Sequence, residues 1–174
     1  MINNSNKNKV YENKLYNKIL FLSRNKLLYT DFCLNDTFQN RISLIFLHVS
    51  FLFIKIKDNN ENLKYKSFYQ NMFDFIFKKI EENMRELGWG DVTVNKKMKD
   101  LVKIFYSILL NCEKYRENTR LVKNVFLYKY LDVLKDKKQA NHCDLVEYFD
   151  KYLSFCIDLT QDNVLKGEIN FIYK

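Results

Sequence analysis

The chain has 174 residues and a mass of 21.2 kDa, which favours one compact domain with a hydrophobic core of its own. Hydrophobic residues make up 47% and aromatic residues 16% of the sequence, so a disordered chain is excluded. The formal net charge of +8 favours an anionic partner. However, the many Lys and Asn residues and the single alanine, Ala140, are typical of an AT-rich coding sequence, so the charge alone is a weak signal for nucleic-acid binding.

The cysteine pattern gives no sign of a disulfide framework. The four cysteines are Cys33, Cys112, Cys143 and Cys156. They are scattered without a Cys-x-x-Cys pair, which is typical of small apolar core residues in a reducing compartment. The alternative is a metal site built from His142, Cys143 and Cys156. Because neither histidine has a partner at i+4, we expect no metal and no cofactor.

The N-terminal part of the chain predicts a basic helix. Residues 1–9 are rich in Asn and Lys and are expected to be a flexible N-terminus, with residues 10–174 forming a single helical domain. We expect no secretory signal, because no apolar core with a small-residue cleavage site follows the basic start. Apolar residues from Tyr11 to Leu22 recur at helical spacing and predict a helix over about 10–28 with several Lys and Arg residues. That basic face is either simply solvated or contacts anionic lipid headgroups or RNA.

The next predicted helix, over about 37–57, is almost wholly apolar. Its apolar stretch from Ile42 to Ile54 is shorter than the ~20 residues that a membrane span requires. It also contains two serines and His48, and Arg41 and Lys55 flank it. We therefore expect a central buried helix, with membrane insertion as the alternative.

The clearest break in the helical pattern lies at Gly88–Asp91. A helix predicted over about 63–87 ends there, and glycine at position 88 suits the left-handed residue that closes a helix. Thr93, or alternatively Asp91, is expected to cap the following helix, about 94–115. Trp89, the only tryptophan, is either an exposed anchor or packs over this turn.

Lysines gather at the beginning of that following helix. Lys96, Lys97, Lys99 and Lys103 lie close to its positive N-terminal end, where cations are electrostatically unfavourable. A local rule that is broken without compensation often marks a functional site. The cluster is therefore either a contact with an anion or partner, or a solvated lysine face.

Helices complete the rest of the chain. We predict one over about 118–135 with Leu121, Val125, Tyr128 and Leu131 on its buried side. A second is expected over about 142–158, and a short one near 161–167. No alternation of strands with helices occurs, so the fold class is all-α, with about six to seven helices and no sheet.

No catalytic signature is present in the sequence. It has no Gly-x-x-x-x-Gly-Lys phosphate loop, no Gly-x-Gly-x-x-Gly turn and no Ser/His/Asp or Cys/His arrangement. We therefore expect a protein that is not an enzyme.

Several segments resemble one known family. The strongest is Met84-Arg85-Glu86-Leu87-Gly88-Trp89-Gly90-Asp91, preceded by Leu47-His48-Val49 and Phe73-Asp74. Val94, Lys96-Lys97-Met98-Lys99, Phe105-Tyr106 and Lys123-Asn124-Val125-Phe126 continue the similarity. With these residues the chain resembles the ubiquinol-cytochrome c chaperone family, the assembly factors of the respiratory cytochrome bc1 complex. Trp89 departs from the family pattern, in which a smaller aliphatic residue is expected.

The resemblance implies a non-enzymatic helical chaperone that binds newly made cytochrome b, associates with the ribosome and works with a small helical partner protein. It implies no DNA binding. A compact bacterial form fits this chain, in the cytoplasm or on the cytoplasmic face of the inner membrane, with peripheral membrane contact. The alternative location is the matrix side of the mitochondrial inner membrane. A generic basic helical module that binds RNA, the ribosome or a membrane surface is the alternative function.

The residues expected to contact partners surround the Gly88–Asp91 break and the helix after it. They are Arg85, Glu86, Gly88, Trp89, Gly90, Asp91, Lys96, Lys97, Lys99, Lys103, Phe105 and Tyr106. No catalytic residue is assigned.

Overall fold

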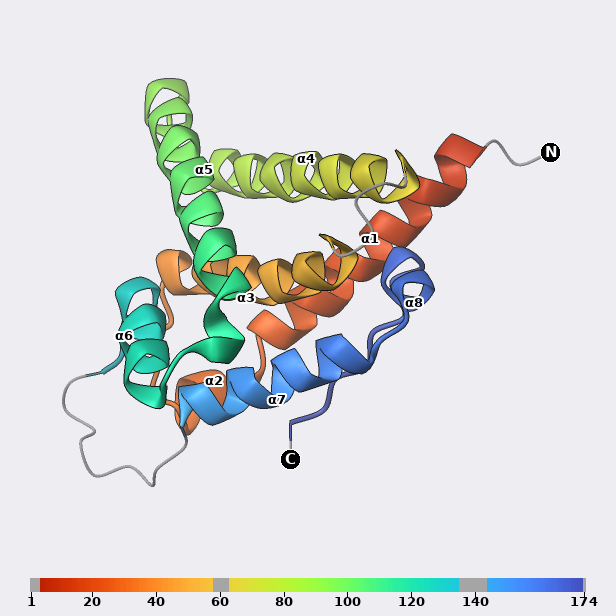
Figure 1. Ribbon diagram of the computed structural model, residues 1–174. Helices are drawn as coiled ribbons and strands as arrows, with labels where there is room; N and C mark the ends of the chain where they lie inside the picture. Colours follow the sequence, from red (N-terminus) through yellow and green to blue (C-terminus); the bar gives the residue numbers. More distant parts are fainter. Residues whose placement is uncertain (1–3, 58–62, 135–143, 174) are drawn as a thin grey trace.

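The helices of the computed structural model pack around α3 (Phe38–Lys57), which crosses the middle of the molecule (Figure 1). The structure describes residues 4–57, 63–134 and 144–173. The other helices in chain order are α1 (Asn4–Ser23), α2 (Lys26–Thr30), α4 (Leu63–Glu86), α5 (Asp91–Glu113), the 3-10 turn η1 (Tyr115–Glu117), α6 (Arg120–Tyr130), α7 (Leu145–Asp158) and α8 (Gln161–Leu165). In the described ranges there is no strand, only an isolated bridge between Leu34 and Val133. The predicted all-α class is confirmed.

Helix α3 is central because it is apolar on nearly every side. From Ile42 to Phe53 every residue is buried, and α1, α4, α5, α7 and α8 all pack against it. It is long and apolar enough to cross a membrane by length and composition, but 78% of that stretch is buried inside the protein. A buried core helix satisfies the same criteria, and this observation favours the central-helix prediction over membrane insertion.

Two polar side chains of α3 tie it to segments that are distant in the sequence. Asn40 donates to the carbonyls of Asn35 and Asp132, both at 2.7 Å, and its own oxygen accepts from the Asp132 N–H at 2.8 Å. His48 contacts the Leu44 carbonyl through Nδ1 at 2.6 Å and the Tyr148 hydroxyl through Nε2 at 2.8 Å. Both side chains are buried and hydrogen-bonded, so they fix the position of α6 and α7 without leaving an unpaired polar atom.

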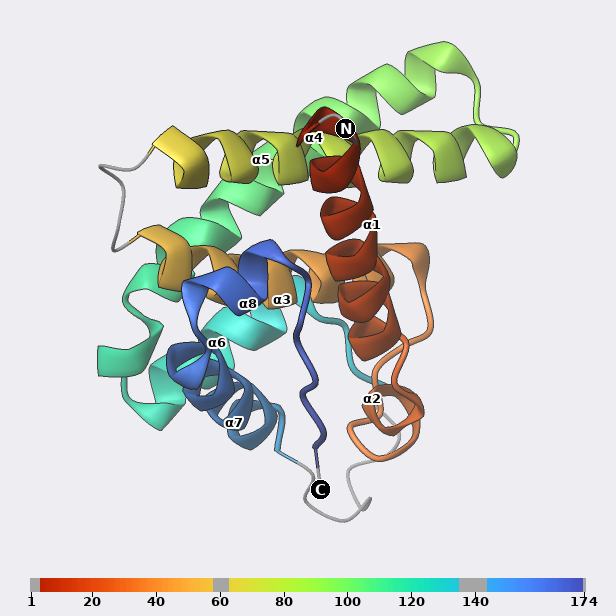
Figure 2. The ribbon, with the colours of Figure 1, turned by 90° about the vertical axis from the view of Figure 1, so that its right-hand side faces the viewer.

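Aromatic side chains fill the two interfaces of α3. Phe46 packs against Phe77 of α4 and Phe105 of α5 with ring centroids at 5.5 and 5.3 Å. On the opposite side, His48 packs against Phe149 and Tyr152 of α7, at 5.5 and 4.7 Å. This large core holds α4 and α5 rigidly, so the corner between them projects from a fixed base (Figures 1 and 2).

The helix boundaries differ from the predicted ones in three places. The first helix starts at Asn4 and stops at Ser23, because the Asn25 side chain accepts from the Leu27 N–H and caps a separate α2. The predicted helix over 118–135 is reduced to α6, which ends at Tyr130. The expected start at residue 142 lies outside the described residues, and α7 begins at Leu145 with Asp144 as its cap. The division into a flexible segment 1–9 and a domain 10–174 stays a prediction.

Candidate partner-binding surface

The corner between α4 and α5 is closed by a backbone motif centred on Gly88. Gly88 has φ +82°, its N–H donates to the Arg85 carbonyl at 2.9 Å, and the Trp89 N–H donates to the Met84 carbonyl at 3.1 Å. This pair of bonds is the Schellman motif, which satisfies the last carbonyls of a helix. The predicted role of Gly88 as the left-handed closing residue is confirmed.

Arg85 fastens the two helices across this corner. Its guanidinium donates to Glu81 Oε1 at 2.9 Å and also pairs with Asp91, the first residue of α5. The hydrogen bonds that it donates to Asp91 and to Glu81, in that order of importance, raise the pKa of Arg85, so it stays charged. Glu86, beside it, is exposed.

The expected capping of α5 by Thr93 or Asp91 is wrong. Helix α5 begins at Asp91, and Gly90 occupies the cap position without a side-chain bond. Asp91 instead lies in the first turn, where its negative charge is favourable at the helix N-terminus and pairs with Arg85. The three additional residues at the start of α5 place its lysines one turn further from the helix end.

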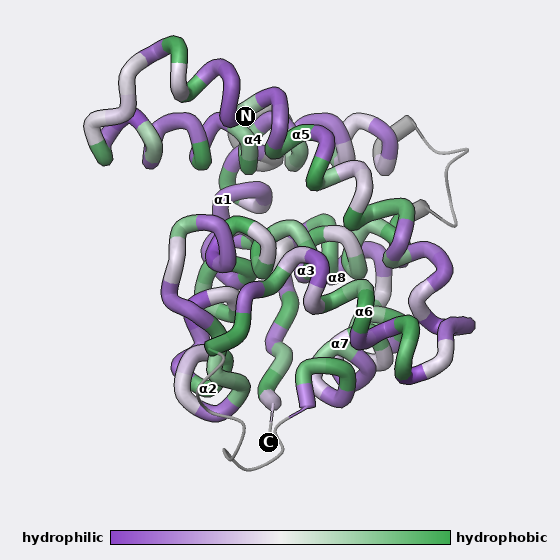
Figure 3. Tube along the Cα trace, turned by 90° about the vertical axis from the view of Figure 1, so that its left-hand side faces the viewer, coloured by the Kyte–Doolittle hydropathy of each residue, from purple (hydrophilic) through white to green (hydrophobic). Residues whose placement is uncertain are grey.

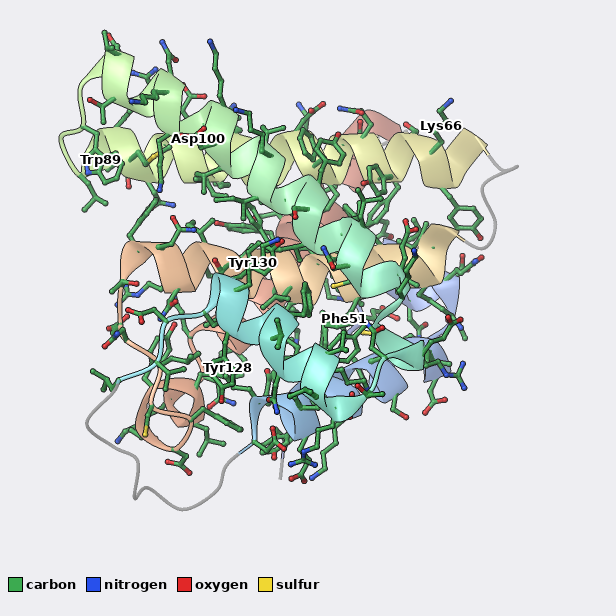
Figure 4. The ribbon with its side chains drawn as sticks, turned by 60° about the vertical axis from the view of Figure 1, so that its left-hand side comes forward. Phe51, Lys66, Trp89, Asp100, Tyr128 and Tyr130 are labelled. Carbon is green, nitrogen blue, oxygen red and sulfur yellow. The ribbon has the colours of Figure 1, made fainter. Side chains whose placement is uncertain are left out.

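Trp89 packs against the protein rather than projecting from it. Its ring lies 5.5 Å from that of Phe38 in the first turn of α3 and is half-buried against the core. Figure 4 shows Trp89 pointing from the corner toward α3. This arrangement favours the packing interpretation of Trp89 over the exposed anchor.

Four residues that the sequence predicts to contact a partner lie in one row on the surface of α5. Lys96, Lys99, Lys103 and Tyr106 are exposed at spacings of three and four residues, and Leu110 continues the row. We call these five residues the α5 outer stripe. The positive charge of the stripe is only weakly offset by nearby carboxylates. The ion pair between Lys103 and Asp100, at 3.8 Å, is highly exposed and therefore weak.

Three predicted site residues of α5 do not belong to this stripe, and the first of them, Asp91, pairs with Arg85 at the start of the helix. Lys97 points the other way, where its Nζ donates to Gln39 Oε1 of α3 at 2.9 Å. Phe105 is fully buried among Phe46, Phe73 and Phe77 and has no surface with which to contact a partner. Lys97 and Phe105 therefore hold α5 in place.

An apolar surface on α6 was missed by the sequence analysis. Leu121 is 73% exposed, Val125 65% and Tyr128 54%, and Val122 is also exposed beside them. We call these four residues the α6 outer face. The prediction that Leu121, Val125 and Tyr128 are buried is wrong, whereas Leu131 is buried as expected. The core side of α6 is formed by Phe126 and Leu127, and Tyr130 bonds Ser107 of α5 at 2.6 Å (Figure 4).

The sequence of α6 shows that this surface is apolar but does not show that it is exposed. Both the 121/125/128 row and the Phe126-Leu127 pair are apolar, so α6 is apolar on two sides. Periodicity finds such rows but cannot choose which of them faces the core. In Figure 3, where α6 is turned toward the viewer, much of this helix is coloured as apolar.

The thiols and carboxylates do not suggest a catalytic or metal centre. No group of three His, Cys, Asp or Glu side chains that could hold a metal occurs among the described residues, and His142 and Cys143 lie outside them. Burial raises the pKa of the Cys156 thiol to about 12, and that of Cys112 is raised for the same reason. These thiols therefore stay protonated and inert at neutral pH.

The described residues define an all-α protein with a basic stripe on α5 and an apolar face on α6. The sequence matches the family described as "Ubiquinol-cytochrome C chaperone" over residues 30–171, and the chain belongs to this family. Among curated proteins no match was found. The crystal structure of a Cbp3 homolog from Brucella abortus has the same fold, with a TM-score of 0.79 and 24% identity over 97% of this chain and 92% of that chain. The resemblance noted from the Gly88–Asp91 region is thus confirmed.

Proposed function

We propose that this protein is a non-enzymatic assembly chaperone of the cytochrome bc1 complex that binds newly made cytochrome b. The observation that carries the proposal is the family match, which spans most of the chain and all helices from α3 to α8. The protein would act in the cytoplasm or on the cytoplasmic face of the inner membrane, together with a small helical partner protein.

The α6 outer face supports a client of this kind. A newly made membrane protein exposes apolar helices, and a chaperone that holds one needs an apolar helix face in return. Leu121, Val125 and Tyr128 follow one another at i, i+4 and i+7 and form such a face. An exposed apolar surface of this kind is typical of an interaction site.

A photo-crosslinking amino acid at Val125 tests client binding. In cells that synthesise labelled cytochrome b, we expect a crosslink between the two proteins soon after synthesis. The matched control carries the crosslinker at Ser154, an exposed position on α7. Crosslinks to cytochrome b of equal yield from both positions, or from neither, would contradict a docking role of the α6 outer face.

The α5 outer stripe supports a second step, association with the ribosome. Lys96, Lys99 and Lys103 present three cations on one side of a rigid helix, which suits a phosphate backbone. The triple variant Lys96→Glu, Lys99→Glu, Lys103→Glu is expected to lose co-sedimentation with ribosomes. Lys97 is left unchanged because it supports α5 through Gln39.

The control for that experiment reverses three exposed lysines elsewhere, Lys9, Lys66 and Lys114, and thus changes the net charge by the same amount. If both triple variants lose ribosome binding equally, the interaction depends on net charge only and the stripe has no special role. If the stripe variant still binds ribosomes, the α5 outer stripe is not the ribosome-binding surface.

A further inference from the structure

A groove beside the C-terminal segment combines exposed apolar side chains with exposed cations. Its volume is about 690 Å³, and residues from the end of α1, the start of α2 and the C-terminal segment line it. Figure 2 shows the course of the backbone in these three segments. Phe21, Arg24 and Lys26 line one side, and Phe171, Ile172 and Tyr173 line the other. None of these residues belongs to the α5 outer stripe or the α6 outer face.

The C-terminal side of the groove is held firmly against α1. Gly167 lies so close to α1 that a Cβ would be 2.8 Å from the Leu15 nitrogen. Lys18 donates to Asn170 at 2.7 Å, and Lys14 pairs with Glu168 at 3.7 Å. Two cations of the predicted basic helix are thus used to fix the C-terminal segment.

The position of Ile172 follows from this attachment. Ile169 is buried, and the rings of Phe171 and Tyr173 pack on Tyr148 at 5.7 and 5.1 Å. Every second residue therefore faces the core, and Ile172, between two of them, is 74% exposed. An aliphatic side chain at a solvent-facing position of a firmly held segment has no structural role in the fold.

Phe21 projects in the same way from α1. Its neighbours Ile19 and Leu22 are buried, whereas Phe21 is 73% exposed and lines the groove opposite Ile172. Arg24 and Lys26 flank the break between α1 and α2, are exposed, and make no ion pair with any described residue.

We propose that this groove is a docking site for the surface of an anionic phospholipid bilayer. Phe21 and Ile172 insert among the acyl chains while Arg24 and Lys26 contact headgroup phosphates, an arrangement typical of proteins that lie on a membrane. A bilayer offers phosphate and hydrocarbon at adjacent depths, so it accepts two protruding apolar side chains without a matched pocket. Ile172 argues against a nucleic acid, because an aliphatic side chain cannot stack on bases. The inference does not depend on the client proposed above.

Vesicle flotation with the purified full chain tests this site. The protein is expected to float with vesicles of phosphatidylglycerol and phosphatidylcholine, to stay unbound with phosphatidylcholine alone, and to dissociate as salt is raised. Neutralising both cations in Arg24→Gln, Lys26→Gln is expected to weaken binding about 25-fold, at about fivefold per cation. Replacing the apolar pair in Phe21→Ser, Ile172→Ser is expected to weaken it at least about tenfold.

Matched variants on other surfaces keep the test specific. Lys96→Gln, Lys99→Gln and Leu121→Ser, Val125→Ser make the same chemical changes on α5 and α6 and are expected to leave flotation unchanged. All four exchanged groove residues are exposed, so circular dichroism should show intact folding in every variant.

Three results would overturn the proposal. One is equal binding to both kinds of vesicle, and another is an equal loss in the control variants. The third is a protein that binds a homopolymeric RNA and does not float with vesicles. In that case the Arg24/Lys26 variant would lose RNA binding and the Phe21/Ile172 variant would keep it. Failure of flotation leaves the cytochrome b crosslink from Val125 unaffected, so the two proposals are separable.

Discussion

His48 shows how one buried side chain makes the fold depend on pH. Its ring is fully buried, and burial lowers its pKa from 6.5 to about 4 despite the hydrogen bond that the ring makes to the Leu44 carbonyl. At neutral pH the ring is uncharged, so one nitrogen donates to Leu44 and the other accepts from the Tyr148 hydroxyl. Protonation would remove that acceptor and bury a charge.

The expected result is a loss of stability in mild acid. The unfolded chain binds a proton at His48 below pH 6.5, whereas the folded chain binds it only below about pH 4. The contribution of the neutral His48 ring to the free energy of unfolding is therefore complete above pH 6.5 and decreases as the pH falls toward 4. Between pH 7 and pH 5 the free energy of unfolding should fall by about 2 kcal/mol from this residue.

Urea unfolding at several pH values measures this effect, with His48→Gln as the control because glutamine does not titrate. The wild-type chain should lose about 2 kcal/mol more than the variant over this pH range. Parallel pH profiles for the two proteins would contradict the assignment.

Gly88 and Gly90 allow the same Gly→Ala substitution to be compared at two positions of the corner between α4 and α5. A Cβ at either position meets no atom within 4 Å, so only backbone conformation separates them. Gly88 has φ +82° and Gly90 has φ −69°. Gly88→Ala is expected to lower the free energy of unfolding by about 1–2 kcal/mol, and Gly90→Ala by less than about 1 kcal/mol.

Thermal unfolding of the two variants checks this expectation, and the fluorescence of Trp89 reports directly on the corner. Equal costs at both positions would mean that the left-handed conformation of Gly88 is not what closes α4.

At the scale of elements, the structure buries the side of α6 that carries Leu127 and exposes the side that carries Leu121, and this arrangement needs a test. Leu127 is buried and Leu121 is 73% exposed on the same helix. Leu127→Ala should therefore destabilise the protein by about 2–5 kcal/mol, whereas Leu121→Ala should change stability by less than about 0.5 kcal/mol. If chemical denaturation showed a larger loss of stability for Leu121→Ala than for Leu127→Ala, the side of α6 predicted from the sequence would be the buried one.

The elements also show which features a sequence can predict. Gly88 was predictable because only glycine adopts its backbone conformation without penalty, and the buried side of α3 was predictable because nearly every residue there is apolar. The side of α6 was not predictable, because two apolar rows compete and tertiary packing decides. The break at Asn25 was missed since the apolar pattern runs through it.

Only some residues of the predicted site lie together on one surface, for a similar reason. Sequence spacing placed Lys96, Lys99 and Lys103 together correctly, but it grouped them with Lys97 and Phe105, which face α3 and the core. Adjacent residues on a helix point in different directions, so a run of site residues in sequence is not a surface. The groove at Phe21 and Ile172 joins two distant segments and could not be found from the chain alone.

At the scale of the whole molecule, three separate surfaces lie on one rigid helical body. The apolar α6 outer face, the basic α5 outer stripe and the groove at the C-terminal segment share no residue. The proposed contacts with a client, the ribosome and a membrane therefore do not compete for the same residues. That combination suits a chaperone that receives a membrane protein during synthesis.

The most direct test of the chaperone assignment is the amount of assembled cytochrome bc1 complex in a strain from which the gene has been deleted. We predict that ubiquinol-cytochrome c reductase activity and spectroscopically detected cytochrome b both fall, while cytochrome b messenger RNA stays at its normal level. Recovery is expected from a plasmid that carries the wild-type gene. Normal levels of the assembled complex in the deletion strain would contradict the account.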